Sequence, residues 1–188
     1  MKIILFNGAP GSGKTESAKY FADKYKSLEI NFKEPLVDLT KRFYQFSDSD
    51  WEHLYKRDNK ETVIQEIGKS PRQCLIHVSE EVIKPVFGKG VFGKIIADKI
   101  RNISYHSTNT IVCGDCGFIE EVYELVKEFG IENIYLVKLI RRGRTFEGDS
   151  RRYISSRMFP DDNYFEIYNA EGLECLYKAL DALAIRVL

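Results

Sequence analysis

A glycine-rich octapeptide near the start of the chain constrains its fold more than any other feature. Residues 8–15 read GAPGSGKT, which matches the pattern GxxxxGK[ST] at every fixed position. An apolar segment, residues 2–6, precedes this loop, and a helix-forming segment, residues 15–25, follows it. A strand, a glycine-rich loop and a helix in this order form the context in which such a loop wraps a phosphate chain. The sequence therefore predicts a P-loop at the end of a strand in an α/β fold.

The fixed positions of the loop each have a physical role in holding a nucleoside triphosphate. Glycines let the backbone curl until its N–H groups point at phosphate oxygens, and the following helix adds the positive end of its dipole. Lys14 can reach the β- and γ-phosphates, and the Thr15 hydroxyl can bind Mg²⁺. We therefore predict a site for ATP and Mg²⁺ made by Gly8, Ala9, Pro10, Gly11, Ser12, Gly13, Lys14 and Thr15. The loop alone does not identify the reaction, because GTPases, ATPases and kinases share it.

Beyond the loop, apolar strands alternate with helices, and this alternation predicts a parallel sheet covered by helices. Five strands are expected at residues 2–6, 28–32, 110–113, 133–140 and 164–168. Helices are expected at residues 15–25, 36–46, 51–56, 60–67, 70–83, 91–101, 119–129 and 173–185. Ser70 should cap the fifth of these helices, with Pro71 at its first position and its end before Pro85. The length of 188 residues suits a single domain, residues 1–188.

Composition narrows the class of partner. The 28 basic residues balance the 28 acidic residues, which argues against wholesale electrostatic binding of nucleic acid. No apolar run approaches the roughly 20 residues that span a bilayer, and the opening apolar segment is too short for the core of a signal peptide. We expect a cytoplasmic protein (in the host cytoplasm if it is viral) that acts on small molecules without nucleic acid or membrane, as a monomer or homodimer. In that compartment the four cysteines should be free thiols.

Asp115 is the candidate metal ligand opposite the P-loop. It directly follows a buried strand, and ligands gather at the carboxyl edge of a parallel sheet. A carboxylate there could hold Mg²⁺ directly or through water; the alternative is an aspartate that only forms a turn between Gly114 and Gly117. Cys113 and Cys116 form a CxxC in the same stretch. A redox or zinc site would need a thioredoxin context or a second ligand pair, and neither is present.

Six arginines gather in one late segment and are the third feature of interest. The planar guanidinium matches phosphate oxygens, so a mobile arginine-rich loop beside a P-loop could close over the transferring group and exclude water. The alternative is a solvated loop whose arginines pair with Glu147 and Asp149. The six residues are Arg141, Arg142, Arg144, Arg151, Arg152 and Arg157.

Two further regions could bind the acceptor of a phosphoryl group. Arg72 lies in the first turn of the helix that Ser70 begins, and it would suit a monophosphate; the alternative is an ordinary surface arginine. Lys33, Glu34 and Asp38 follow the second strand, where a carboxylate such as Asp38 would suit a sugar hydroxyl or a base. A group of aromatic residues could stack a nucleobase or pack in the core: Phe43, Tyr44, Phe46, Trp51 and Tyr55.

With these features placed, the chain resembles the deoxynucleoside monophosphate kinases of tailed bacteriophages, a branch of the P-loop nucleoside monophosphate kinases. The resemblance rests on the segments IILFNG (3–8), FKEPLVD (32–38), SPRQCL (70–75), IVCGD (111–115), LIRRG (139–143) and YFEIYN (164–169). It implies a three-layer α/β/α kinase fold with a five-stranded parallel sheet. It also implies an acceptor-binding helical region at about residues 33–105 and an arginine-rich lid at about residues 141–162.

The same resemblance implies transfer of the γ-phosphoryl group of ATP to a (deoxy)nucleoside monophosphate, with Mg²⁺. Catalytic roles would fall to Lys14, Arg72, Asp115, Arg141, Arg142 and Arg151. Acceptor contacts would come from Lys33, Pro35, Asp38 and Arg72, and metal contacts from Thr15 and Asp115. Asn169 would join the P-loop in binding ATP. The chain departs from the family at Gly117, where an arginine is frequent, and at Ile76 and Ser79; a lid arginine could replace the missing one.

Two alternatives remain open. One is a P-loop kinase of another small acceptor, such as shikimate, gluconate or a nucleoside; a nucleoside would call for a carboxylate, Glu34 or Asp38, near its 5′-hydroxyl. The other is a nucleotide-sensing module without catalysis, whose partner protein reads closure of the lid.

Overall fold

The computed structural model describes residues 1–188 except 57, 105–108 and 171, and it divides them into two compact units. The sheet unit comprises Met1–Phe32 and Gly93–Leu188. The helical unit comprises Lys33–Phe92. Among the described residues, no helix combines the length and the apolar character that a membrane crossing requires.

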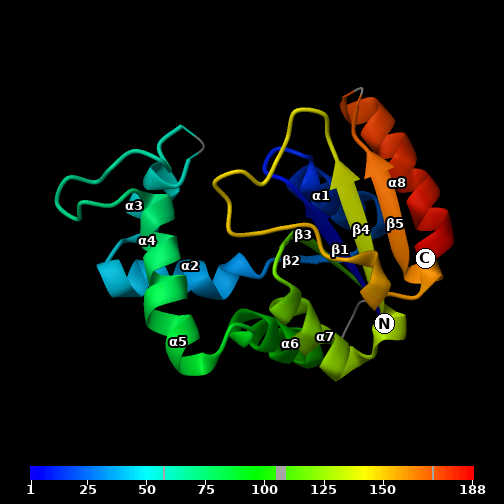
Figure 1. The fold of residues 1–188 in the computed structure, drawn as a ribbon, viewed down its shortest axis with the longest axis horizontal. Coiled ribbons are helices and arrows are strands. Elements are labelled where there is room, and N and C mark those ends of the chain that lie inside the picture. The colour runs from blue at the N-terminus through cyan, green and yellow to red at the C-terminus, as the bar shows by residue number, and fades with distance from the viewer. Residues whose placement is uncertain (57, 105–108, 171) are drawn as a thin grey trace. The chain divides into compact units, whose positions relative to one another are not determined.

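A five-stranded parallel sheet forms the centre of the sheet unit, as predicted (Figure 1). Its order is β2-β3-β1-β4-β5, so the strand that leads into the P-loop is central. In the register, Leu5 of β1 lies beside Cys113 of β3 and Leu136 of β4. The strands are β1 (Lys2–Gly8), β2 (Leu28–Ile30), β3 (Thr110–Cys116), β4 (Ile134–Ile140) and β5 (Tyr164–Tyr168).

Both faces of the sheet are covered by helices, which makes the three layers that the sequence predicted. Side chains alternate between the faces along a strand, so Ile3 and Leu5 pack with α6 and α7, whereas Ile4 and Phe6 pack with α1 and α8. Because both of its faces are buried, β1 has a continuous apolar run. The helices are α1 (Lys14–Tyr25), α6 (Val91–Ser104), α7 (Ile119–Phe129) and α8 (Leu173–Val187), with short 3₁₀-helices at Ile131–Asn133, Ser156–Met158 and Asp161–Asn163.

The helical unit contains α2 (Lys33–Tyr44), α3 (Asp48–Leu54), α4 (Pro71–Ile76) and α5 (Lys84–Phe87), with a π-helix, His77–Ile83, between the last two. Ser70 caps α4 as predicted: its hydroxyl accepts a hydrogen bond from the Gln73 backbone N–H, and the Gln73 side chain accepts one from the Ser70 N–H. Pro71 occupies the first turn, where the missing N–H costs nothing.

Four helix predictions were wrong in this part of the chain, and one of them is residues 51–56, where the helix is Asp48–Leu54. Residues 60–67 form turns and not a helix, because the β-branched run Thr62, Val63 and Ile64 disfavours helix and Ile64 instead pairs with Lys69 as an isolated bridge. Helical structure continues past Pro85, since that proline lies in the first turn of α5. The second predicted helix begins earlier, at Lys33.

Helices α6 and α7 approach each other closely at Gly93. A Cβ atom added there would lie 2.4 Å from the Glu121 carbonyl oxygen and 2.6 Å from the Glu121 Cα. Both atoms belong to backbone, which cannot rotate away as a side chain would. A residue without a side chain is therefore required at this point of the layer that covers β1 and β3.

We expect Gly93→Ala to lower the free energy of unfolding by about 1–3 kcal/mol, because the added methyl group overpacks this contact. Helix propensity alone would favour alanine over glycine by about 1 kcal/mol, so the sign of the change is diagnostic. Urea unfolding followed by circular dichroism measures it. Lys94→Ala, an exposed position on the same helix, is the matched control. A Gly93→Ala protein more stable than the wild type would show that the close approach is absent.

Candidate active site

The P-loop is folded tightly between β1 and α1. Gly11 and Gly13 have φ of 76° and 106°, in the left-handed region that favours glycine, and the Ser12 N–H donates to the Ala9 carbonyl at 3.1 Å. A Cβ atom added at Gly8 would lie 2.5 Å from the Ser12 Oγ and 2.6 Å from the Leu139 carbonyl oxygen. Three of the predicted loop glycines thus stand where the backbone needs them.

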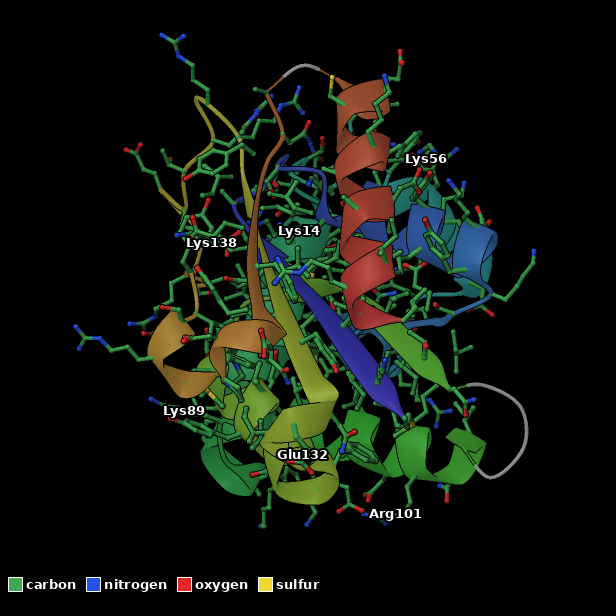
Figure 2. All side chains as sticks on the ribbon, turned by 90° about the vertical axis from the view of Figure 1, so that its right-hand side faces the viewer. Lys14, Lys56, Lys89, Arg101, Glu132 and Lys138 are labelled. Carbon is green, nitrogen blue, oxygen red and sulfur yellow. The ribbon has the colours of Figure 1, made fainter. Side chains whose placement is uncertain are left out.

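Lys14 is the first residue of α1 and lies inside the fold (Figure 2). It is only 7% exposed, and its Nζ donates to the carbonyl oxygens of Gly8 at 2.6 Å and Ala9 at 2.9 Å. Gly13, the residue at the amino end of α1, has no side chain with which to cap the helix, and Thr15 in the first turn is exposed. The ammonium group, the helix amino terminus and the Thr15 hydroxyl therefore gather at the loop, an arrangement suited to an anion.

The electrostatic environment of Lys14 lowers its pKa from 10.5 to about 8. Burial is the largest cause, because it penalises the charged ammonium form, and the nearby charge of Arg151 acts in the same direction. Asp149 and Asp115 oppose the shift. A bound phosphate would add negative charge beside Lys14 and so favour its charged ammonium form.

Asn169, predicted to bind ATP, contacts the backbone of the P-loop. It follows β5, its backbone N–H donates to the Ile140 carbonyl at 2.8 Å, and its side-chain Nδ2 donates to the Ser12 carbonyl at 2.9 Å. A Cβ atom on Gly13 would lie 2.8 Å from this Nδ2. The contact of Asn169 in this structure is thus with the loop backbone, and a direct contact with ATP stays a prediction.

Asp115 lies beside the start of α1. A Cβ atom added at its neighbour Gly114 would lie 3.2 Å from the Thr15 Cα, so β3 and α1 touch here. Strand β3 continues through Asp115, which excludes the alternative of a simple turn residue. Its Oδ1 accepts hydrogen bonds from the Phe32 N–H at 2.9 Å and the Cys113 thiol at 3.1 Å, which orient the carboxylate.

The donor set near Thr15 and Asp115 fits Mg²⁺ bound with a nucleotide. Across the described part of the chain, no cluster of three or more His, Cys, Asp or Glu side chains could hold a metal ion by itself. Mg²⁺ commonly uses one or two protein oxygens together with substrate phosphates.

Because burial raises the pKa values of the Cys113 and Cys116 thiols well above their usual value, the CxxC carries inert thiols.

Three of the six arginines converge on the P-loop and the end of β3. Arg141 Nη1 donates to the Gly11 carbonyl at 3.1 Å. The side chain of Arg144 lies against Gly11, where an added Cβ would be 3.3 Å from its Nε. Arg151 lies on Gly117, and its charge acts on Lys14. Arg142, predicted to be catalytic, is exposed and shows no such contact among the described residues. Arg144, which the structure brings to the loop, was predicted only as a member of the cluster and not as a catalytic residue.

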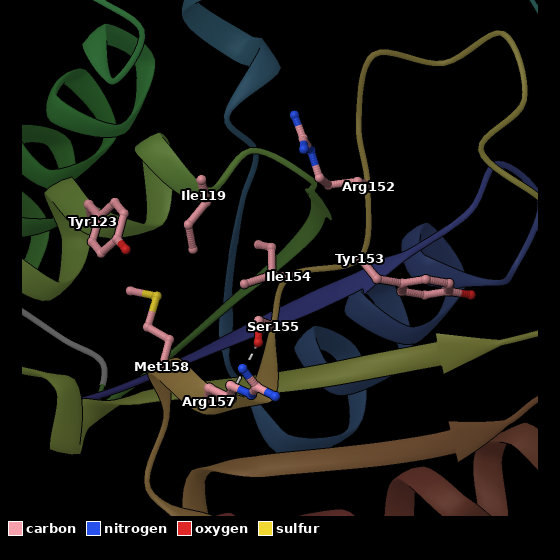
Figure 3. A pocket seen from close by; sticks show the side chains of 8 residues that line it. All are labelled: Ile119, Tyr123, Arg152, Tyr153, Ile154, Ser155, Arg157 and Met158. Carbon is pink, nitrogen blue, oxygen red and sulfur yellow. Dashed lines mark hydrogen bonds between the residues drawn. The ribbon is translucent and has the colours of Figure 1, made fainter.

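The remaining two arginines line a separate pocket (Figure 3). Arg152 and Arg157 contribute to it, together with Ile119 and Tyr123 of α7, and Tyr153 points away from Tyr123. No P-loop residue lines this pocket. The arginine segment, residues 141–157, therefore places some of its charges at the P-loop and others at this pocket.

Asn7 is a buried residue that the sequence reasoning missed. Its Nδ2 donates to the carbonyl oxygens of Cys116 at 3.1 Å and Arg152 at 3.0 Å, and its Oδ1 accepts from the Ile154 N–H at 2.9 Å. The Asn7 side chain, near the end of β1, thus joins the end of β3 to the backbone of Arg152 and Ile154. The available signal was a polar residue at the end of an otherwise apolar strand.

The predicted acceptor residues belong to the helical unit. Lys33 and Pro35 lie in the first turn of α2, and Asp38 forms an ion pair with Lys41 at 3.3 Å. Arg72 Nη1 lies 3.4 Å from the Glu61 Oε1. Their acceptor role stays a prediction.

The candidate base-stacking residues stack on one another. The rings of Trp51 and Tyr55 are 4.9 Å apart, and those of Tyr44 and Phe46 are 5.8 Å apart. Trp51 is buried, whereas Phe43 is 51% exposed. Trp51 therefore belongs to the interior of the helical unit, whereas Tyr44, Phe46 and Tyr55 are half-buried.

The three-layer architecture and the P-loop define the class: a P-loop kinase fold of the α/β type. A putative deoxynucleotide monophosphate kinase of Acanthamoeba polyphaga mimivirus is 29% identical to the chain over 153 residues, which cover 76% of each protein. This similarity confirms the resemblance that the sequence predicted. No protein-family model matches the chain.

Two solved structures align with the chain over its whole length, and the first of them has a similar fold. TT1252 from Thermus thermophilus has a TM-score of 0.51 at 15% identity, with 100% of this chain and 98% of that chain covered. An unliganded sugar kinase from Janibacter sp. HTCC2649 has a TM-score of 0.48 at 14% identity, with 100% and 96% covered.

We expect Asn7→Asp to lower the free energy of unfolding at pH 7 by about 3 kcal/mol or more, because a buried carboxylate would face two carbonyl oxygens. Urea unfolding measures the loss. The loss should shrink as the pH falls and the carboxyl group becomes protonated, since a carboxylic acid can donate one hydrogen bond. Asn102→Asp, at an exposed position of α6, is the control. Equal losses in the two variants would contradict the anchoring role of Asn7.

Proposed function

We propose that this chain is an ATP-dependent (deoxy)nucleoside monophosphate kinase, which transfers the γ-phosphoryl group to the acceptor and forms the diphosphate. The observation that carries the proposal is the placing of three arginines at the P-loop and Lys14: Arg141 and Arg144 contact Gly11, and the charge of Arg151 acts on Lys14. Such concentrated positive charge suits the transfer of a phosphoryl group between two anionic nucleotides. The name of the mimivirus relative supports the same acceptor.

The reaction needs alignment and charge neutralisation more than proton transfer. The acceptor phosphate is already an anion at neutral pH, so no strong general base is required, and the protein's part is to hold donor and acceptor in line. Lys14 and the loop amides would hold the donor phosphates. Mg²⁺, held by Thr15 and Asp115, would neutralise charge on the phosphates when bound.

The acceptor side of the proposal rests on the helical unit and on the lid. Arg72 is assigned to the acceptor phosphate, with Lys33, Pro35 and Asp38 around the nucleoside. Residues 141–162 are assigned to the lid. In the lid, Arg141, Arg142 and Arg151 are assigned to cover the transferring group. A closed lid would exclude water, which is the competing acceptor. We place the activity in the cytoplasm, and in the host cytoplasm if the source is viral.

A panel of acceptors tests the reaction. With γ-labelled ATP and Mg²⁺, we expect the purified chain to label (deoxy)nucleoside monophosphates as diphosphates, and to leave nucleosides, shikimate and gluconate unlabelled. Lys14→Ala should lower kcat/KM by roughly 100-fold or more, because a charge that faces the transferred group is lost. Thin-layer separation of the labelled products measures both results.

Lys19→Ala, an exposed lysine on the same helix, controls for a general loss of positive charge. Labelling of a sugar acid or nucleoside alone would replace the proposed acceptor with another. No labelling of any acceptor by folded protein would favour the nucleotide-sensing alternative.

Binding of Mg·ATP should take up a proton near Lys14. Its pKa is about 8 in the free protein, and a neighbouring phosphate raises the pKa of a lysine. At pH 8.5 the uptake should be roughly 0.7 proton, and at pH 7 below about 0.1. Calorimetry in two buffers with different ionisation enthalpies measures it.

Lys14→Arg is the control, because a guanidinium stays charged throughout this pH range. Its binding should lose the extra proton uptake at pH 8.5. A wild-type binding enthalpy that is the same in both buffers at pH 8.5 would contradict the assignment of the phosphate site to Lys14.

A further inference from the structure

Arg151 is held by Asp149 through three hydrogen bonds. Its backbone N–H and its Nε each donate to the Asp149 Oδ1 at 2.9 Å, and its Nη2 donates to the Asp149 Oδ2 at 2.6 Å. Two parallel bonds of this kind fix the plane of the guanidinium as well as its distance. The side chain of Asp149 is 3% exposed and that of Arg151 is 26% exposed, so the pair is sheltered from water on the carboxylate side.

Gly117 provides the surface on which the Arg151 side chain rests. A Cβ atom added at Gly117 would lie 2.6 Å from both the Cγ and the Cδ of Arg151. Any other residue at this position would push the arginine away. The Arg152 N–H also donates to the Gly117 carbonyl at 3.3 Å, which keeps the two stretches of backbone together.

The residues on both sides of this pair are anchored to the sheet unit. The Asp149 N–H donates to the Phe146 carbonyl at 2.9 Å, and the Phe146 ring packs edge-on against Tyr153 at 4.9 Å. The Tyr153 hydroxyl donates to the carbonyl of Leu139 in β4 at 3.2 Å. Asn7 also binds the Arg152 carbonyl, so the residues before and after Arg151 are both held in place.

Arg151 also stands next to the phosphate site. Its charge acts on Lys14 and on Cys116 of β3, and Lys14 acts on Cys116 too. Two like charges that face one site repel each other until an anion arrives. The Asp149 carboxylate, whose charge acts on Lys14 as well, offsets this repulsion and keeps the arginine in place.

We propose that Asp149 is a positioning residue, which holds Arg151 on Gly117 and directs its guanidinium to the P-loop before the nucleotide binds. This inference rests on the proposed function and deepens it. The arginine is preset, so the reaction does not spend binding energy on ordering a long side chain. Gly117 leaves the space that the Arg151 side chain occupies.

Steady-state kinetics of single and double variants test the inference. Arg151→Ala should lower kcat roughly 100-fold, and Asp149→Asn and Gly117→Ala should each lower it roughly tenfold, with little change in KM for ATP. In the Arg151→Ala background, Asp149→Asn should have no further effect on kcat, because Asp149 acts through the arginine. Glu147→Gln, an exposed acid of the same segment, is the control and should keep the wild-type kcat.

Chemical rescue separates positioning from a merely structural role. Millimolar guanidinium should restore part of the kcat of Arg151→Ala, and it should restore little when Asp149→Asn is also present, since the carboxylate that would hold it is gone. The inference is overturned if Asp149→Asn alone leaves kcat unchanged, or if its effect persists in full without Arg151. A wild-type chain that phosphorylates no acceptor would instead overturn the proposed function.

Discussion

A lysine ammonium buried at the end of the central strand is the interaction on which the site depends. Burial of a charge is costly unless hydrogen bonds and opposite charges compensate it, and Lys14 meets two loop carbonyls and the fields of Asp115 and Asp149. The compensation is partial, as its pKa of about 8 shows. The order of the sheet meets this need, because β3 and β4 flank β1 and bring Asp115 and the arginine segment to the same edge of the sheet.

The arginine segment meets a second electrostatic problem. The guanidinium of Arg151 and the buried ammonium of Lys14 repel each other, and the fold offsets part of this repulsion with the sheltered carboxylate of Asp149. Asn7 joins the segment to the ends of β1 and β3, so the backbone of Arg152 and Ile154 stays with the sheet. The result is a segment that is anchored at its base and positively charged where it faces the P-loop.

Much of the sheet unit could be predicted because its signals are local. The bounds of α7 and β5 agree with the expected residues 119–129 and 164–168, since a glycine ends the helix and an apolar alternation marks the strand. The helical unit was harder. Residues 60–67 have helix-forming neighbours but a β-branched centre. The π-helix His77–Ile83 leads directly into α5, whose first turn contains the proline that was expected to end the helix.

By itself, the sequence determined the P-loop, the five parallel strands and the surplus of arginines after β4, because glycine spacing, apolar runs and residue counts are properties of short stretches. Only the tertiary structure decided which side chains act together. Asn7 and Arg152 are far apart in the chain, as are Gly117 and Arg151, and no local pattern predicts that their atoms meet. The same holds for Asn169, whose side chain supports the loop backbone. Such contacts arise from the packing of strands and segments that are distant in sequence, and packing depends on the whole fold.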